Sequence, residues 1–216
     1  MLLAPHHLLT FALFALTFAP VAHAERLPRP DHIVVVIEEN RGYLQIMDKL
    51  NRDSYIHALA KRGVLFTQSY GVTHPSQPNY LALFSGSTQG IISNDCPNTF
   101  SSDNLATALR DAGLSFASFA ESLPKAGDLS CMSGGYQRKH NPLANWQGTR
   151  LPAELNKRFT DFPQDFARLP TVSFVIPDQD HDMHNGSFFA ADEWLRTRIG
   201  PYADWAMQHN SLLILT

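Results

Sequence analysis

The sequence predicts an α/β protein, a three-layer sandwich built on a mostly parallel, doubly wound sheet. Three observations lead to this prediction. Short runs of branched apolar residues, typical of strands buried on both faces, recur along the chain. They alternate with segments that carry helix start and stop signals. Polar residues collect where the apolar runs end, which is the edge at which such sheets bind ligands.

Composition limits the class of partner. The chain has 216 residues, a net charge of −3 and no run of Lys or Arg. This length supports one sizeable core, and we predict a single domain over residues 25–216. The charge pattern is unlike the basic surface with which proteins bind nucleic acid or an acidic membrane.

The first 24 residues are predicted to be a secretory signal peptide. The apolar run "LLTFALFALTFAPVAHA" closes on Ala22-His23-Ala24, an A-x-A cleavage pattern, although no Lys or Arg precedes it. A membrane anchor is the alternative, but the run is short of the ~20 residues that span a bilayer. We therefore expect a periplasmic or secreted protein without a stable anchor. In that oxidising compartment, Cys96 and Cys131 are expected to form a disulfide rather than remain two free thiols.

The first half of the mature chain alternates strand and helix. "HIVVVIEEN", residues 32–40, is typical of a strand of a parallel sheet. A helix is predicted to begin at Asp53 as N-cap and to end at Gly63, and "VLFTQSYGV", residues 64–72, to form the next strand. Asp103 is expected to cap a further helix that ends at Gly113.

The second half repeats the alternation. A strand is predicted over 114–121, followed by a loop region, rich in Gly and Pro, from about 123 to 163. Residues 171–177 form a further buried strand, residues 191–208 a helical stretch interrupted by proline, and residues 211–216 a final strand.

The end of the first strand carries Glu38, Glu39 and Asn40. Carboxylate and amide oxygens are ligands that a hard divalent cation prefers. The same residues are also compatible with a solvated turn that includes Arg41 and Gly42. Both readings remain open at this point.

"HPSQPNY", residues 74–80, places Ser76 at or just before the start of a helix, because Pro78 suits a first turn. A serine at this position commonly caps the helix. Alternatively its hydroxyl acts as a nucleophile, supported by the helix dipole and a metal ion.

"PDQDHDMHNGS", residues 177–187, follows a buried strand. A calcium-binding loop is excluded, because Met183 and Phe189 stand where that loop needs Gly and Glu. Asp182 and His184, with His181 nearby, remain as candidate site residues. "RKHNP" adds His140 in a loop.

Taken together and in this order, "EEN", "THPSQPNYLALFSGST", "KHNP" and "IPDQDHDMHNGS" resemble the bacterial phosphoesterase family. This family includes exported acid phosphatases and non-haemolytic phospholipases C, and belongs to the alkaline phosphatase superfamily. The resemblance runs from about His32 to the end of the chain. It implies an alkaline-phosphatase-like fold.

The resemblance also implies site roles. Glu39, Asn40 and Ser76 resemble the metal ligands, and Ser76 the nucleophile. Asp182 and His184 resemble catalytic residues of the family. The residues that resemble its substrate-binding groups are Asn40, His140 and Asn79. One divalent metal ion (Mg, Ca, Mn or Zn) is implied, and a small phosphate ester as substrate.

The implied reaction passes through a phosphoserine, and phosphomonoesterase activity is preferred over phospholipase C-type phosphodiesterase activity. A metal-free serine hydrolase is disfavoured because no G-x-S-x-G elbow is present. The sequence does not indicate an oligomeric state.

The chain departs from the family at Thr216. Family members continue there with acidic residues that complete the metal sphere, whereas this sequence stops. We therefore expect a C-terminally incomplete fragment or a truncated gene product that binds metal weakly and turns over slowly or not at all. Robust phosphatase activity of the purified chain would contradict this expectation. The non-enzymatic alternative is an inert binding protein.

Overall fold

The computed structural model describes residues 28–147 and 150–216, so the predicted signal peptide lies outside the described residues. Its main element is a five-stranded sheet in the order β5-β2-β6-β1-β7, with every neighbouring pair parallel. The strands are β1 His32–Val36, β2 Phe116–Ala120, β5 Asn156–Arg158, β6 Val172–Ile176 and β7 Ser211–Leu215. A separate hairpin consists of β3 Met132–Ser133 and β4 Tyr136–Gln137.

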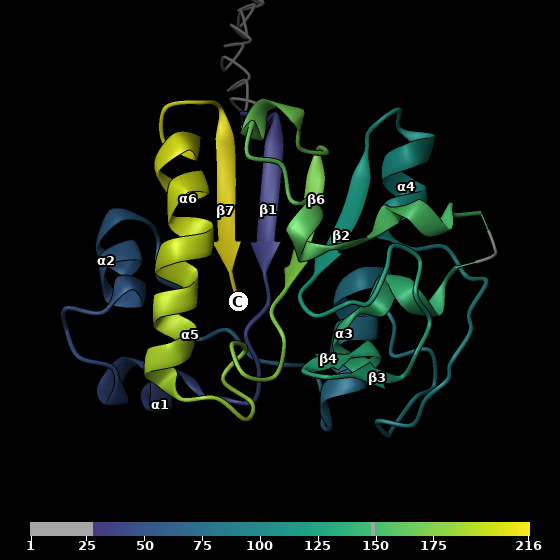
Figure 1. Cartoon of the computed structure of the whole chain (residues 1–216), viewed down its shortest axis with the longest axis horizontal. Coiled ribbons are helices and arrows are strands. Elements are labelled where there is room, and N and C mark those ends of the chain that lie inside the picture. The colour runs from purple at the N-terminus through teal and green to yellow at the C-terminus, as the bar shows by residue number, and fades with distance from the viewer. Residues whose placement is uncertain (1–27, 148–149) are drawn as a thin grey trace, which may run out of the picture.

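Helices cover both faces of the sheet, which confirms the predicted α/β architecture (Figure 1). The helices are α1 Tyr43–Lys49, α2 Tyr55–Arg62, α3 Ser76–Ser85, α4 Leu105–Asp111, α5 Phe188–Trp194 and α6 Gly200–Ala206. A π-helical turn, η6 Leu195–Ile199, joins α5 to α6. Five 3₁₀ turns complete the list: η1 Arg138–His140, η2 Pro142–Asn145, η3 Ala153–Leu155, η4 Phe159–Asp161 and η5 Phe166–Arg168.

Two hydrophobic clusters form the core, one on each face of the sheet. Val34 and Val36 of β1 pack in the cluster with α5, η6 and α6, whereas Val35 and Ile37 pack in the cluster with α3 and α4. This alternation follows from the period of two along a strand, and it explains why β1 is apolar on both faces. It also decides to which face each polar residue after β1 points.

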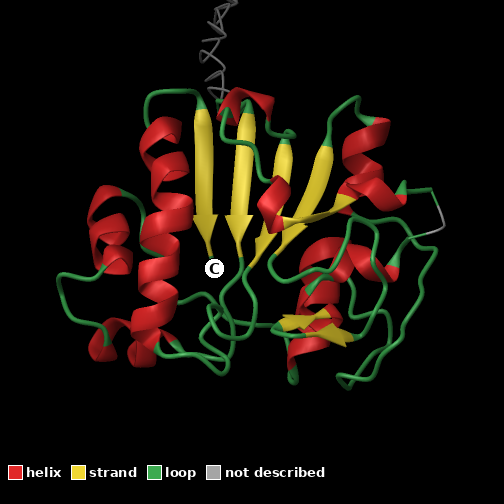
Figure 2. Cartoon of the chain, viewed as in Figure 1, coloured by secondary structure: helices red, strands yellow, loops and turns green. Residues whose placement is uncertain are grey.

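The loops that follow β1, β2 and β6 lie at the carboxyl edge of the sheet, below the arrowheads in Figure 2. The parallel ladder continues for a few residues past the assigned strands: the Ile37 N–H donates to Val175, and the Glu38 N–H donates to Thr216. The predicted disulfide between Cys96 and Cys131 is present and ties the 93–98 loop to the segment before β3.

Two predicted caps are wrong by one residue. Ser54, not Asp53, is the N-cap of α2, and Asn104, not Asp103, is the N-cap of α4. In each case two adjacent residues favour the cap position, and the neighbour that is less exposed takes it. Asn104 completes a capping box with Thr107, whose hydroxyl accepts the Asn104 N–H.

Two further predictions are corrected. Residues 64–72 form no strand: Val64, Phe66 and Val72 lie exposed, and none of them pairs with a described strand. Local strand preference cannot form a strand without a partner for the backbone hydrogen bonds. The predicted loop region 123–163 conversely contributes β5 to the main sheet. The sequence does not reveal this strand, because three residues are too few to show a period of alternating apolar and polar side chains.

The start of α2 depends on a distant carboxylate. Asp192 of α5 accepts hydrogen bonds from the backbone N–H groups of Tyr55 and Ile56, each at 2.8 Å. Asp192→Ala is expected to lower the free energy of unfolding by about 2–3 kcal/mol, because it leaves two backbone donors, one buried and one partly buried, without their charged acceptor. Urea denaturation measures this loss. Asp204→Ala, which removes the exposed ion pair with Arg62 at the other end of α2, is expected to cost less than about 0.5 kcal/mol. Equal losses for both variants would contradict the capping role.

Candidate active site

Five of the predicted residues meet at the carboxyl edge of the sheet, on the α3 face. The Ser76 hydroxyl donates a hydrogen bond to Oε1 of Glu39. The His140 ring lies between two carboxylates, with Nε2 at 3.5 Å from Glu39 Oε1 and Nδ1 at 3.1 Å from Asp182 Oδ2. The His184 N–H donates to Asp182 Oδ1 at 2.8 Å, and its Nε2 lies 3.8 Å from Glu39 Oε2. Segments from four parts of the sequence therefore form one polar cluster.

The position of Ser76 follows from the sequence. It is the first residue of α3, preceded by the N-cap Pro75, and Pro78 lies in the first turn. The helix has no side-chain cap, so the hydroxyl of Ser76 is not used for capping and turns to Glu39 instead. The first-turn N–H groups and the helix dipole favour an anion beside this hydroxyl. One of these groups, the Gln77 N–H, is bonded to Asn94.

Glu39 reaches Ser76 because of the strand period. Ile37 points to the α3 face, and Glu39, two residues later, points the same way, while Glu38 points to the opposite face. Burial raises the pKa of Glu39, but the neighbouring His140 ring and the hydrogen bond from Ser76 outweigh it, and the pKa is lowered overall. Burial raises the pKa of Glu38 well above its usual range, and both Glu38 carboxyl oxygens are buried without a hydrogen bond. The two adjacent glutamates therefore have opposite electrostatic characters.

His140 is held rigidly. Burial alone would lower its pKa, but the carboxylates of Asp182 and Glu39 on either side of the ring raise it overall. The ring of Tyr80 stacks on the imidazole, with centroids 5.0 Å apart. The next residue, Asn141, is fully buried and bonds Ser118 of β2 and Asn156 of β5. These contacts anchor the η1 turn to the sheet and fix the ring between its two carboxylates.

Asn40 and Asn79 lie differently. Asn40 is exposed, follows Glu39 and has a left-handed backbone with φ +56°, a conformation that Asn adopts more readily than most residues. The Asn79 amide donates to the carbonyls of Thr73 and Pro75, and its oxygen accepts the Thr73 N–H. We infer that Asn79 shapes the loop before Ser76, since its side chain is committed to that loop.

A second group of ligand-type side chains was assigned no role by sequence reasoning. Ligand atoms of Glu121, Asp178 and His181 lie within 4.8 Å of one another. His181 Nδ1 is 2.9 Å from Glu121 Oε2 and 3.3 Å from Asp178 Oδ1. Glu121 and Asp178 each follow a strand, and this position was the feature of the sequence that could have marked them as candidate site residues. Their meeting depends on β2 and β6 being neighbours, which the sequence does not state.

The residues present are compatible with a divalent cation at two places. Glu39 Oε2 is buried and has no hydrogen-bond partner, and Ser76 offers a hydroxyl oxygen beside it, a donor set that suits a hard cation. Glu121, Asp178 and His181 offer two carboxylates and an imidazole. In the second group the carboxylates are already bonded, because Glu121 accepts the Trp194 indole N–H and Asp178 accepts the Ser122 hydroxyl. The buried Glu39 Oε2, which has no hydrogen-bond partner, therefore favours the site at Glu39 and Ser76 for the cation.

Comparisons with known proteins identify the family to which the chain belongs. Residues 45–216 match the model of the phosphoesterase family. A phosphatidylinositol-3-phosphatase of Mycobacterium tuberculosis is 44% identical over 196 residues, which cover 89% of this chain and 64% of the relative. An acid phosphatase of Aspergillus fumigatus is 32% identical, covering 76% of this chain and 39% of the relative. A phosphate-repressible acid phosphatase of Penicillium chrysogenum is 30% identical, and the match covers 94% of this chain and 51% of the relative. The chain thus spans between about two fifths and two thirds of these relatives.

Proposed function

Because the chain belongs to the phosphoesterase family, as the sequence motifs predicted, we propose that it is the catalytic part of a metal-dependent phosphatase that acts through Ser76. The observation that carries the proposal is the contact between the Ser76 hydroxyl and the buried Glu39 carboxylate at the start of α3. The reaction class is phosphate monoester hydrolysis, which the similarity to relatives named acid phosphatases supports.

The first step forms a bond between Ser76 Oγ and phosphorus and breaks the bond from phosphorus to the leaving oxygen. Glu39 accepts the hydroxyl hydrogen bond, orients Oγ for attack and takes its proton, which returns to Oγ when water displaces the phosphate in the second step. His184 is the proposed proton donor to the leaving oxygen, since its side chain is 26% exposed and near the cluster, whereas both ring nitrogens of His140 face carboxylates. Water then attacks the phosphoserine, which frees Ser76 and inorganic phosphate.

Glu39, Asn40 and Ser76 are the residues proposed to hold the cation. When bound, a divalent cation (Mg, Ca, Mn or Zn) would offset negative charge on the phosphoryl oxygens and favour the ionised serine. A hard cation takes about six or more oxygen ligands, so these three residues leave most positions to substrate, water or other groups. The Glu121, Asp178 and His181 group is the second candidate for a cation.

Export is part of the proposal. The A-x-A pattern at Ala22–Ala24 lies outside the described residues, but the disulfide between Cys96 and Cys131 is compatible with an oxidising compartment. In the described part of the chain, no helix has the length and apolar character needed to cross a bilayer. Periplasmic or secreted placement of a protein that acts on small phosphate esters is the proposed setting.

One assay series tests the reaction class. We expect the chain, supplied with millimolar divalent cation, to hydrolyse an aryl phosphate such as p-nitrophenyl phosphate slowly, because Glu39, Asn40 and Ser76 fill only part of a cation's coordination sphere. It should act at least about 100-fold less well on phosphatidylcholine, because the preferred class is the monoester. A chelator should remove the activity and a serine-acylating reagent should not. The opposite pattern of inhibition would identify a metal-free serine hydrolase. Preference for phosphatidylcholine would identify a phospholipase C-type enzyme, and no turnover of either ester would support a non-catalytic binding protein.

A further inference from the structure

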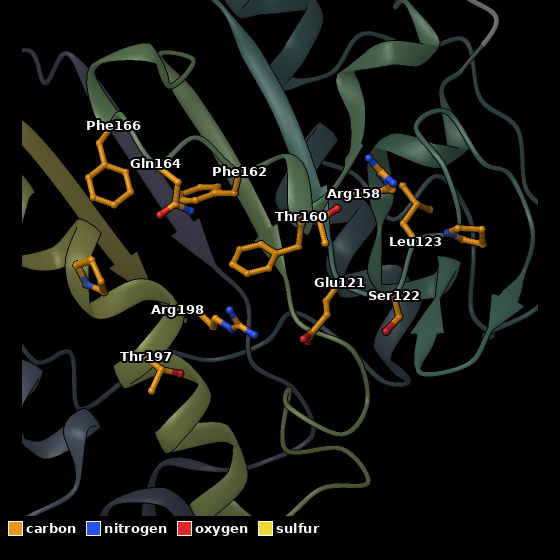
Figure 3. A pocket seen from close by; sticks show the side chains of 13 residues that line it. Glu121, Ser122, Leu123, Arg158, Thr160, Phe162, Gln164, Phe166, Thr197 and Arg198 are labelled. Carbon is orange, nitrogen blue, oxygen red and sulfur yellow. The ribbon is translucent and has the colours of Figure 1, made fainter.

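A cavity of about 590 Å³ lies beside η6 and the start of α6 (Figure 3), and neither Ser76 nor any other residue of α3 lines it. It is bounded by the segment 158–166, by the residues just after β2, and by η6 with the start of α6. Its volume falls within the range of small-molecule sites, which are mostly apolar with a few convergent polar groups. The proposed phosphatase reaction assigns no role to the cavity itself, although Glu121 at its wall belongs to the second candidate cation group.

One wall of the cavity is aromatic. Phe159 stacks on Phe162 with ring centroids 5.5 Å apart, and Phe162 meets Phe166 at 6.2 Å. Phe162 is buried, while the other two rings are partly exposed. A row of partly hydrated rings beside open space favours a flat apolar group, because ring contact adds to the gain from burying apolar area.

The opposite wall carries one cation that no described residue neutralises. Arg158 forms an ion pair with Asp161, but the guanidinium of Arg198 makes no hydrogen bond or ion pair with any residue in 28–147 or 150–216. The acid at the cavity, Glu121, is already bonded to the Trp194 indole N–H and the His181 ring. Among the charged side chains that line the cavity, Arg198 is therefore the one cation without an ion pair in the described part of the chain.

Arg198 lies on the wall because of η6. A π-helical turn is rare and frequently occurs at functional sites. Here it places Thr197 and Arg198 on the cavity, whereas the neighbouring Arg196 is paired with Glu193 and does not line the cavity. The two arginines thus provide a matched pair, one at the cavity and one beside it.

We propose that this cavity binds an aromatic anion, a flat ring that carries a carboxylate, sulfonate or phosphate group. The ring lies against the Phe159, Phe162 and Phe166 wall, and the anionic group meets Arg198. This ligand is separate from the ester that Ser76 attacks, so the inference does not depend on phosphatase activity.

The test uses 8-anilinonaphthalene-1-sulfonate, an aromatic sulfonate whose fluorescence rises on binding. We expect saturable binding at one site in the unchanged protein, with about tenfold weaker binding in Arg198→Gln. Arg196→Gln should bind as the unchanged protein does. Both substitutions are at exposed positions, and thermal unfolding checks that the variants stay folded. Equal affinities in Arg198→Gln and Arg196→Gln would overturn the proposal.

Two further measurements locate the probe. In a two-dimensional NMR spectrum the indole N–H of Trp194, which bonds Glu121 at the cavity, is expected to shift on binding. The indole of Trp146, which belongs to the cluster on the other face, should not. Ser76→Ala should leave the affinity for the probe unchanged. Loss of binding in Ser76→Ala would place the probe at the active site and would also overturn the inference.

Discussion

Ser76→Ala is expected to reduce aryl phosphate hydrolysis by about 10⁴-fold or to the uncatalysed rate, because it removes the attacking oxygen. The substitution deletes one hydroxyl from the first residue of α3, which has no capping role there, so the fold should persist. Initial rates at saturating substrate and millimolar cation measure the effect. Rapid acid quenching of a reaction with ³²P-labelled ester should trap label on the unchanged protein and none on the variant.

Ser85→Ala is the matched control for this prediction. Ser85 is the last residue of the same helix, and its hydroxyl donates to the Leu81 carbonyl. We expect full activity and normal phosphoserine trapping in this variant. If Ser76→Ala retained more than about a tenth of the activity, Ser76 would not be the nucleophile.

Glu39→Gln is expected to lower activity by at least about 100-fold, since it keeps the shape of the side chain but removes the negative charge beside Ser76. The same substitution should raise the cation concentration needed for half-maximal activity and weaken cation binding measured by calorimetry. These two readouts distinguish loss of a ligand from a general loss of stability, which would leave the cation dependence of the remaining activity unchanged.

Glu38→Gln gives the comparison on the same strand end. Glu38 points to the opposite face, and its buried carboxyl oxygens have no hydrogen-bond partner. An amide adds no buried charge there, so we expect activity within about threefold of the unchanged protein and the same cation dependence. A larger loss in Glu38→Gln than in Glu39→Gln would move the proposed cation site to the other face of the sheet.

Much of the scaffold was predictable because it depends on local patterns. The apolar runs at 32–36, 116–120 and 172–176 form strands as expected, and Pro78 correctly indicated a helix that begins near Ser76. The disulfide was also predicted correctly, from compartment and cysteine count. Residues 64–72 show the limit of this approach, since strand preference does not reveal whether a partner strand exists.

The motifs identified the segments of the candidate site but not its contacts. Ser76 and Glu39 are 37 residues apart and touch because α3 packs on the face to which Glu39 points. His140 was a weak signal in a loop, yet the structure places it between Glu39 and Asp182. Glu121 was visible only as a polar residue after a strand. Its proximity to Asp178 and His181 requires the strand order.

By itself, the sequence determined most of the strands and helices, the family, and the serine at the start of α3, because these depend on neighbours within a turn or on motif order. It did not determine β5 or the absence of a strand over 64–72. The tertiary structure alone decided which carboxylates face His140, that Asp192 caps a helix 136 residues away in sequence, and that three phenylalanines and Arg198 enclose a cavity. The physical reason is that the order of strands in the sheet and the face on which each helix packs set all long-range contacts. Neither is encoded in local periodicity.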